Sequence, residues 1–171
     1  MNQTTMARLD QMEQVEFVLL VGLVFEHSPW IAAKAWGERP FRSLEQLHQA
    51  LCEIVKKAGE DRQVELIRAH PDLVGRAALA GALTRESTKE QAAAGLDKLS
   101  PGEIALFQKQ NTAYQYKFGF PFVICARLNK KEAILKGFEQ RLKHSPAREI
   151  QIALEEIFKI AELRLRDLIS G

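Results

Sequence analysis

Ser100-Pro101-Gly102-Glu103 opens a stretch that runs to Phe118 and is followed by Gly119. A serine with a glutamate three residues later lets two side chains satisfy two backbone amides at a helix N-terminus. Proline stands here at the first helical position, where a missing amide hydrogen costs nothing, and glycine commonly follows a last turn. The stretch therefore predicts a helix over residues 101–118.

The same three-residue spacing occurs at four other places: Asp10 with Glu13, Ser43 with Gln46, Ser87 with Glu90, and Asn129 with Glu132. Five such starts indicate a helical protein. Helix ends agree with them, because Gly59 follows a periodic segment and Pro71 prevents His70 from comfortably staying helical. Apolar residues at helical spacing between 44 and 55 and between 150 and 161 mark faces that pack into a core.

The segment from Gly119 to Leu128 is apolar, short and interrupted by Pro121, so we expect it to be extended and packed among helices. The chain has 171 residues, of which 46% are hydrophobic, enough for one core. We therefore expect an all-α protein, a single compact domain over residues 1–171 with about seven or eight helices and one short extended segment. Only residues 1–8 are expected to be loose, by their polarity and terminal position.

Charge and cysteine content exclude several classes of protein. The 24 basic and 22 acidic residues are scattered, so no basic stripe predicts nucleic-acid binding. Cys52 and Cys125 lie far apart without zinc-type spacing, which favours reduced thiols in a cytoplasmic protein. The apolar run Phe17 to Phe25 is too short to span a membrane and carries no basic segment before it, so we interpret it as a buried helix.

His70 is the first candidate for chemistry. Histidine titrates near neutrality, and a carboxylate that holds it gives the acid/base pair that proton transfer requires. Its position at an expected helix end is more often that of a histidine that caps a helix or packs in the core. Glu90 likewise has a structural explanation, as the third residue of the Ser87 capping box. These residues alone leave both interpretations open.

The order of several short strings adds a further argument. They are Phe25-Glu26-His27-Ser28-Pro29-Trp30, Arg39-Pro40-Phe41, His70-Pro71-Asp72-Leu73, residues 87–96, Phe118-Gly119-Phe120-Pro121-Phe122, and residues 160–168. Each is weak alone, whereas their order and spacing together are specific. The chain resembles the 2-oxo-4-hydroxy-4-carboxy-5-ureidoimidazoline (OHCU) decarboxylases, which act in urate breakdown and yield (S)-allantoin.

This resemblance implies site residues and partners. His70 matches the catalytic histidine and Glu90 the carboxylate that holds it, while the matched substrate-binding positions are Pro71, Ser87, Gln91, Val123, Ile124, Cys125 and Arg164. Arg164 matches the clamp for the substrate carboxylate, a role that suits a two-pronged donor, and Arg127 is a weaker candidate for it. Ser87 could serve only as a cap. No metal or other cofactor is implied.

The substrate itself explains why no cofactor is expected. Its carboxylate-bearing carbon also carries a hydroxyl and adjoins a ring carbon–nitrogen double bond, which accepts the electrons released with carbon dioxide. The protein must bind the carboxylate, help the hydroxyl become a carbonyl and protonate one face of the neighbouring carbon. Backbone groups at Val123 to Cys125 would hold the flat polar heterocycle.

Two alternatives remain at this point. One is a non-catalytic helical interaction domain; the other, less favoured, is a metal-dependent hydrolase using His70, Glu90 and another histidine, although no His-Glu-x-x-His pattern supports it. The family also suggests a homodimer and occurs fused ahead of a urate oxidase domain, so the chain could be part of a longer protein or act with a urate oxidase. The absence of a Ser-Lys-Leu end favours a bacterial cytoplasm.

Overall fold

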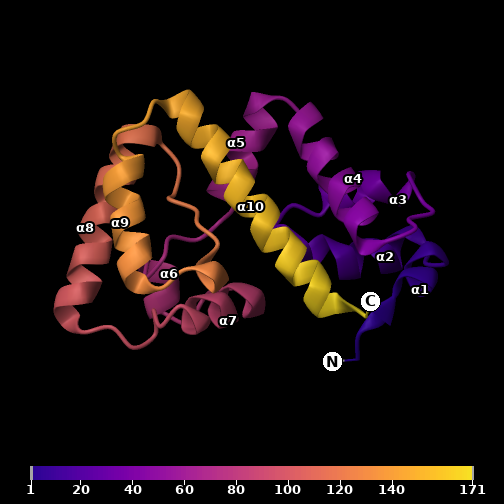
Figure 1. The fold of residues 1–171 in the computed structure, drawn as a ribbon, viewed down its shortest axis with the longest axis horizontal. Coiled ribbons are helices and arrows are strands. Elements are labelled where there is room, and N and C mark those ends of the chain that lie inside the picture. Colours follow the sequence, from indigo (N-terminus) through magenta and orange to yellow (C-terminus); the bar gives the residue numbers. More distant parts are fainter. Residues whose placement is uncertain (1, 171) are drawn as a thin grey trace. The chain divides into compact units, whose positions relative to one another are not determined.

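The computed structural model describes residues 2–170, whose regular secondary structure is almost entirely helical (Figure 1). The elements in order are β1 (Thr4–Thr5), α1 (Met6–Asp10), α2 (Gln14–Val21), η1 (Gly22–Val24), α3 (Trp30–Trp36), α4 (Leu44–Lys57), α5 (Glu60–Arg68), α6 (Arg76–Leu79), α7 (Arg85–Ala93), α8 (Pro101–Phe118), η2 (Ala126–Leu128), α9 (Lys131–Arg141), α10 (Pro146–Leu168) and β2 (Ile169–Ser170). The all-α prediction is confirmed.

The described residues contain ten α-helices rather than seven or eight. Two of them are very short: α1 has five residues and α6 has four. Helices of one turn carry too few residues to show a periodic apolar face, so the sequence pattern did not reveal them.

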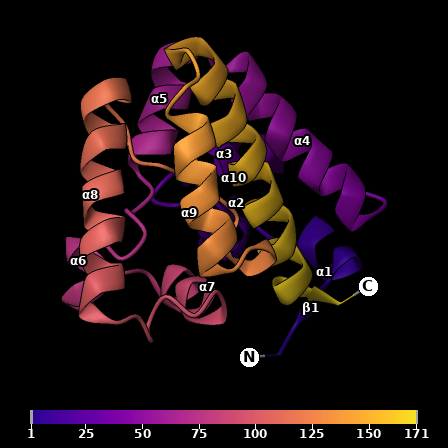
Figure 2. The same cartoon turned by 60° about the vertical axis from the view of Figure 1, so that its left-hand side comes forward.

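The chain divides into two compact units, one formed by Met1–Ala69 with Phe158–Gly171 and the other by His70–Ile157. In the first unit, α3 packs against both α2 and α4. In the second unit, α8 and α9 lie side by side, as Figures 1 and 2 both show, and α7 packs against η2. The long helix α10 contributes its first residues to the second unit and its last residues to the first.

Two expectations about the N-terminal region need correction. Residues 4–8 are not loose, because Thr4 and Thr5 pair in parallel with Ile169 and Ser170, and the Thr5 side chain caps α1. The run Phe17 to Phe25 is helical only in part and is not buried all round. Phe17 and Val21 are buried, whereas Leu19 is 71% exposed. The run was expected to be buried because it is apolar throughout, but residues four apart lie on one face of a helix, and the face that carries Leu19 and Leu23 points to solvent.

Helix starts match the predicted capping pairs at two of the five places. Ser100 and Glu103 form a complete capping box with Pro101 at the first position, and Ser43 accepts a hydrogen bond from Gln46 N. The Ser87 prediction is wrong, because Thr84 caps α7 and accepts from Ser87 N at 3.2 Å. The remaining two pairs, beginning at Asp10 and Asn129, do not cap helices either.

The turn between α5 and α6 is unusually constrained. Val74 has a positive φ of 53°, which β-branched residues rarely adopt. A β-carbon added at Gly75 would lie 2.6 Å from Asp72 Cβ and 3.3 Å from its carbonyl oxygen. The backbone thus folds back on itself between Asp72 and Gly75, immediately after His70 and Pro71, and glycine is required there by space.

We predict that Gly75→Ala destabilises the protein by about 1 to 3 kcal/mol, the usual cost of forcing an extra carbon into a packed site. Thermal unfolding followed by circular dichroism would measure this effect. Gly102→Ala is a matched control, because a β-carbon there meets nothing closer than 4.0 Å. Equal melting temperatures for the two variants would contradict the described turn.

Candidate functional site

Gln91 joins helix α7 to the turn that begins at His70. Its Oε1 accepts from Val74 N at 3.1 Å, and its Nε2 donates to Asp72 O at 3.4 Å. His70 follows Ala69, the C-cap of α5, as expected for a residue at a helix end, and Glu90 precedes Gln91 on α7. Both side chains are buried. The two elements that carry the predicted acid/base pair are therefore held together inside the second unit.

Helix α8 holds the same turn from another side. Asn111 Nδ2 donates to Leu73 O at 2.7 Å, and Gln115 Nε2 lies 3.2 Å from each carboxylate oxygen of Asp72. Burial raises the pKa of Asp72 above its usual range, and the Gln115 bond opposes this only in part. Within residues 2–170, Asn111 Oδ1 is buried and accepts no hydrogen bond, so an open acceptor lies beside this turn.

Because Thr84 rather than Ser87 caps α7, Glu90 is not part of a capping box. It is the sixth residue of the helix rather than the third after a Ser87 cap, so capping does not explain it. A carboxylate that is buried usually requires a specific partner or a role. Ser87, which lies one turn earlier, is buried as well and donates its amide to the Thr84 hydroxyl.

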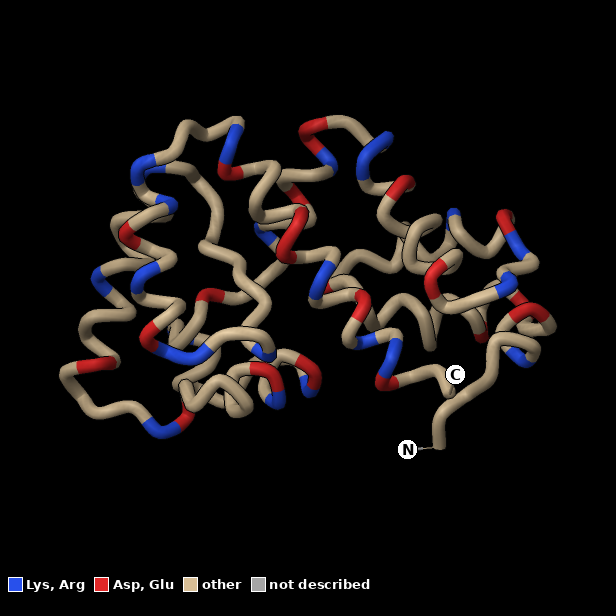
Figure 3. Tube along the Cα trace, viewed as in Figure 1, with Lys and Arg blue, Asp and Glu red and all other residues tan. Residues whose placement is uncertain are grey.

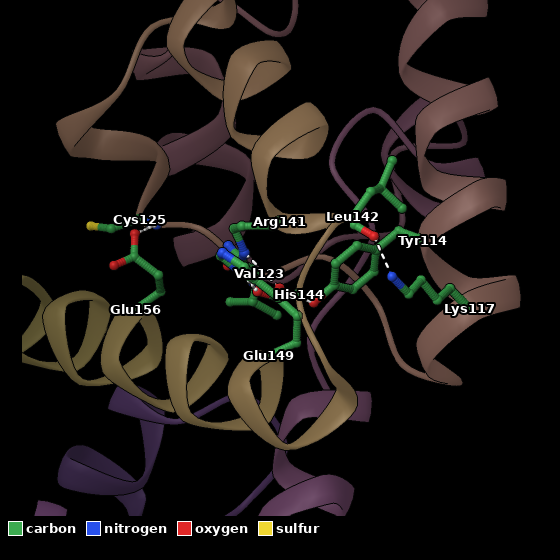
Figure 4. Close-up of polar contacts among 9 residues, drawn as sticks. All are labelled: Tyr114, Lys117, Val123, Cys125, Arg141, Leu142, His144, Glu149 and Glu156. Carbon is green, nitrogen blue, oxygen red and sulfur yellow. Dashed lines mark hydrogen bonds and ion pairs between the residues drawn. The ribbon is translucent and has the colours of Figure 1, made fainter.

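The segment after α8 is extended and has no strand partner among the described residues, as expected. Two buried side chains hold its backbone instead (Figure 4). Arg141 Nη1 donates to Val123 O at 2.6 Å, and Cys125 N donates to Glu156 Oε1 at 3.3 Å. Among residues 2–170 no hydrogen bond involves the backbone of Ile124. Its N–H and C=O are therefore open to a ligand.

Sequence reasoning missed the buried network behind this segment. Glu149 is fully buried, and its Oε1 accepts from Arg141 Nε at 2.7 Å and from the Tyr114 hydroxyl at 2.5 Å. Its Oε2 lies 2.9 Å from His144 Nδ1 (Figure 4). Burial raises the pKa of Tyr114, and the negative Glu149 adds to this rise while Arg141 opposes it. The residues come from three helices and the loop before α10, so no local spacing could have revealed the network.

Arg164 lies in the first unit, on α10, and is buried. Its Nη2 donates to Glu26 Oε1 at 2.9 Å, and its Nη1 donates to Leu23 O at 3.3 Å. Glu26 is buried too, and its other oxygen lies 3.7 Å from His27 Nε2. Arg164 is therefore a buried, salt-bridged arginine rather than a solvated one. Arg127, the weaker candidate, is exposed in η2.

The predicted site residues fall into both units. His70, Pro71, Ser87, Glu90, Gln91, Val123, Ile124 and Cys125 belong to the second unit, and Arg164 belongs to the first. In the second unit, Gln91 links α7 to the His70 turn, and the packing of α7 on η2 brings the Val123–Cys125 segment to the same end of the unit.

Residues 2–170 contain no group of three or more His, Cys, Asp or Glu side chains that could hold a metal ion. None of the described helices is long and apolar enough to cross a membrane. Basic and acidic residues are interspersed along the trace in Figure 3, in agreement with the scattered charges of the sequence.

Comparisons with known proteins give one result over nearly the whole chain. Residues 10–166 match the family described as OHCU decarboxylase. The chain is 43% identical over 168 residues to a 2-oxo-4-hydroxy-4-carboxy-5-ureidoimidazoline decarboxylase of Halalkalicoccus jeotgali, covering 98% of this chain and 93% of that protein. It is also 38% identical over 166 residues to the uric acid degradation bifunctional protein PucL of Bacillus subtilis, covering 97% of this chain and 33% of that protein.

A solved structure is similar as well. The crystal structure of (S)-allantoin synthase aligns with a TM-score of 0.78 and 29% sequence identity, covering 97% of this chain and 54% of that one. The present chain thus spans about half the length of that protein. The family match and the similarity in sequence and in fold agree, and the chain belongs to the OHCU decarboxylase family.

Proposed function

We propose that the protein is a carboxy-lyase that converts OHCU to (S)-allantoin in urate degradation. Family membership over residues 10–166 supports this reaction. The observation that carries it is the junction of α7 with the His70 turn, where Gln91 binds Val74 N and Asp72 O. A buried histidine and a buried glutamate on elements joined in this way suit proton transfer.

His70 is the proposed acid/base, and Glu90 is the group that orients it and bonds to substrate. Decarboxylation leaves a planar carbon next to the one that carried the carboxylate. Protonation of this neighbouring carbon from one side would give a single enantiomer. Glu90 suits this role because its carboxylate is buried on α7 and has no place in a capping box. An ionised partner also stabilises the imidazolium form that such catalysis passes through.

Arg164 is the proposed carboxylate clamp. Its guanidinium already serves two acceptors, Glu26 and Leu23 O, and arginine carries five donor hydrogens in a fixed fork. The family position supports the assignment, and Glu26 would fix the direction of the fork.

The polar heterocycle would be bound by neutral groups. Ile124 offers an N–H and a C=O, which match the neighbouring acceptor and donor of a ureido group or a ring amide. Pro71, Ser87, Gln91, Val123 and Cys125 complete the proposed set of substrate contacts. The Gln91 amide keeps one hydrogen and one lone pair after binding the turn, so it can serve the turn and substrate together.

Three wider assignments belong to this proposal. The family match crosses both units, which supports treating residues 1–171 as one OHCU decarboxylase domain. The bifunctional relative supports a chain that acts with, or as part of, a longer urate-degrading protein. We also propose a cytoplasmic location and a homodimer, as the family resemblance suggests, and the two free buried cysteines suit a reducing compartment.

The direct test is the rate at which freshly prepared OHCU loses carbon dioxide, measured with and without the purified protein. We expect acceleration that persists in excess chelator, because no metal takes part in the proposed reaction. Loss of activity in chelator and its recovery with zinc would instead support a metal-dependent enzyme. No acceleration under any condition would favour a non-catalytic helical domain.

Glu90→Gln and His70→Asn test the acid/base pair. Glutamine keeps the size of the Glu90 side chain, so the melting temperature should change little, whereas turnover should fall by a factor on the order of 10² to 10⁴. The double variant should lose far less than the product of the two single losses, because residues that act as one unit are not additive. Glu86→Gln, one turn earlier on α7, is the matched control and should keep wild-type turnover.

Near-normal turnover in Glu90→Gln would exclude a catalytic role for this carboxylate. Losses that simply multiply in the double variant would show that the two residues act independently.

Arg164→Lys tests the clamp. Lysine keeps the charge but cannot bind Glu26, Leu23 O and a carboxylate in the same geometry, so KM for OHCU should rise by roughly 10- to 100-fold, the scale of one charge-assisted hydrogen bond. The melting temperature should also fall, because the Glu26 pair is buried. Arg166→Lys, half-exposed on the same helix and paired with Glu162, should change neither quantity. An unchanged KM in Arg164→Lys would remove Arg164 from the substrate site.

A further inference from the structure

Four buried polar residues of the second unit have no part in the reaction described above: Tyr114, Arg141, Glu149 and Glu156. A buried ion pair is expensive, and well-packed apolar side chains of similar volume are often at least as stable. Stability alone therefore gives no reason for Arg141 and Glu149 to be here. Their contacts lead to the backbone of the segment that the proposed function assigns to substrate.

Arg141 is fixed before it reaches that segment. Its Nε binds Glu149, and its guanidinium lies over the Phe122 ring at 4.1 Å. The Tyr114 hydroxyl, which donates to Glu149, is 3.4 Å from Arg141 Nη2. The bond to Glu149 and the Phe122 ring fix the plane of the fork, and Nη1 then donates to Val123 O.

Glu156 holds the same segment two residues further on. In an extended backbone the N–H and C=O of one residue project to the same side, and those of the next residue project to the opposite side. Arg141 at Val123 O and Glu156 at Cys125 N thus occupy one edge of the segment. The backbone groups of Ile124 belong to the other edge, where no described residue binds them.

We propose that Arg141 and Glu156 are positioning residues, which hold Val123–Cys125 by one edge so that Ile124 N–H and C=O are presented to the substrate in a fixed direction. Glu149 acts one step further back by orienting Arg141. The inference rests on the proposed function, since it takes OHCU as the ligand of this segment. It adds residues that do not touch substrate themselves but determine how tightly it binds.

The experiment compares KM and kcat for OHCU with the dissociation constant of (S)-allantoin from titration calorimetry. Arg141→Lys cannot serve Glu149 and Val123 O together, so KM and the dissociation constant should each rise at least roughly tenfold, the scale of one lost charge-assisted hydrogen bond. A merely structural role would lower the melting temperature and the active fraction, which reduces kcat and leaves KM unchanged.

Tyr114→Phe is the matched control for stability. It removes the hydroxyl from Glu149 and should lower the melting temperature, but it leaves both contacts to the segment in place. Its KM should stay within about twofold of wild type, well below the effect of one lost charged bond. A KM that rises as much in Tyr114→Phe as in Arg141→Lys would follow stability and would overturn the proposal.

Glu156 supplies a second pair of variants, which decides the matter if Arg141→Lys does not fold. Glu156→Gln keeps an acceptor for Cys125 N and should bind nearly as well as wild type, whereas Glu156→Met has similar size without the acceptor and should show the raised KM. An unchanged KM in folded Glu156→Met would overturn the proposal. Wild-type protein that fails to decarboxylate OHCU would instead overturn the proposed function, so the two failures are distinguishable.

Discussion

The two hydrogen bonds of the Gln91 side chain fix helix α7 to the turn that begins at His70. One of these bonds is accepted by the amide oxygen and the other is donated by the amide nitrogen, so a single side chain fixes both Val74 N and Asp72 O in the turn. Asn111 fixes a third point from α8. The proposed proton transfer requires donor and acceptor within hydrogen-bond reach, and three directional bonds to one short turn would supply that precision.

Each unit also contains a buried arginine–glutamate pair, Arg141 with Glu149 and Arg164 with Glu26. In both pairs the arginine also donates to a main-chain carbonyl, at Val123 and Leu23 respectively. Removing two charges from water is costly, and the pair recovers that cost only with good geometry and further hydrogen bonds. A planar fork that binds a carboxylate and a carbonyl together meets this condition, which lysine could not.

The sequence predicted the features that local chemistry determines. The Ser100 capping box, the Gly119 stop with φ 77° and the buried stripe of α4 each depend on residues within a few turns of one another. The cap of α7 was missed because Thr84 and Ser87 both satisfy the rules for a cap, and only the actual path of the chain selects Thr84. The strand pair at the termini joins Thr4 to Ile169, a separation at which no spacing rule applies.

The residues of the candidate site also differ in whether the sequence could predict them. The family resemblance supplied His70, Glu90 and Arg164 by position and paired Glu90 with His70, but it gave no residue that holds Arg164, the His70 turn or the extended segment. The supporting residues come from distant places in the sequence: Asn111 for the turn, Glu26 for Arg164, and Arg141 with Glu156 for the extended segment. Their roles depend on three-dimensional contacts between elements, which composition and periodicity do not encode.

The central claim is that His70 delivers a proton to one face of the carbon beside the departing carboxylate. The most direct measurement is to let the protein act on OHCU in D₂O and to analyse the allantoin by circular dichroism and mass spectrometry. The account predicts (S)-allantoin that carries deuterium at its stereogenic carbon, with the excess of one enantiomer lost in His70→Asn. Racemic allantoin from the wild-type protein, or an undiminished excess in His70→Asn, would contradict it.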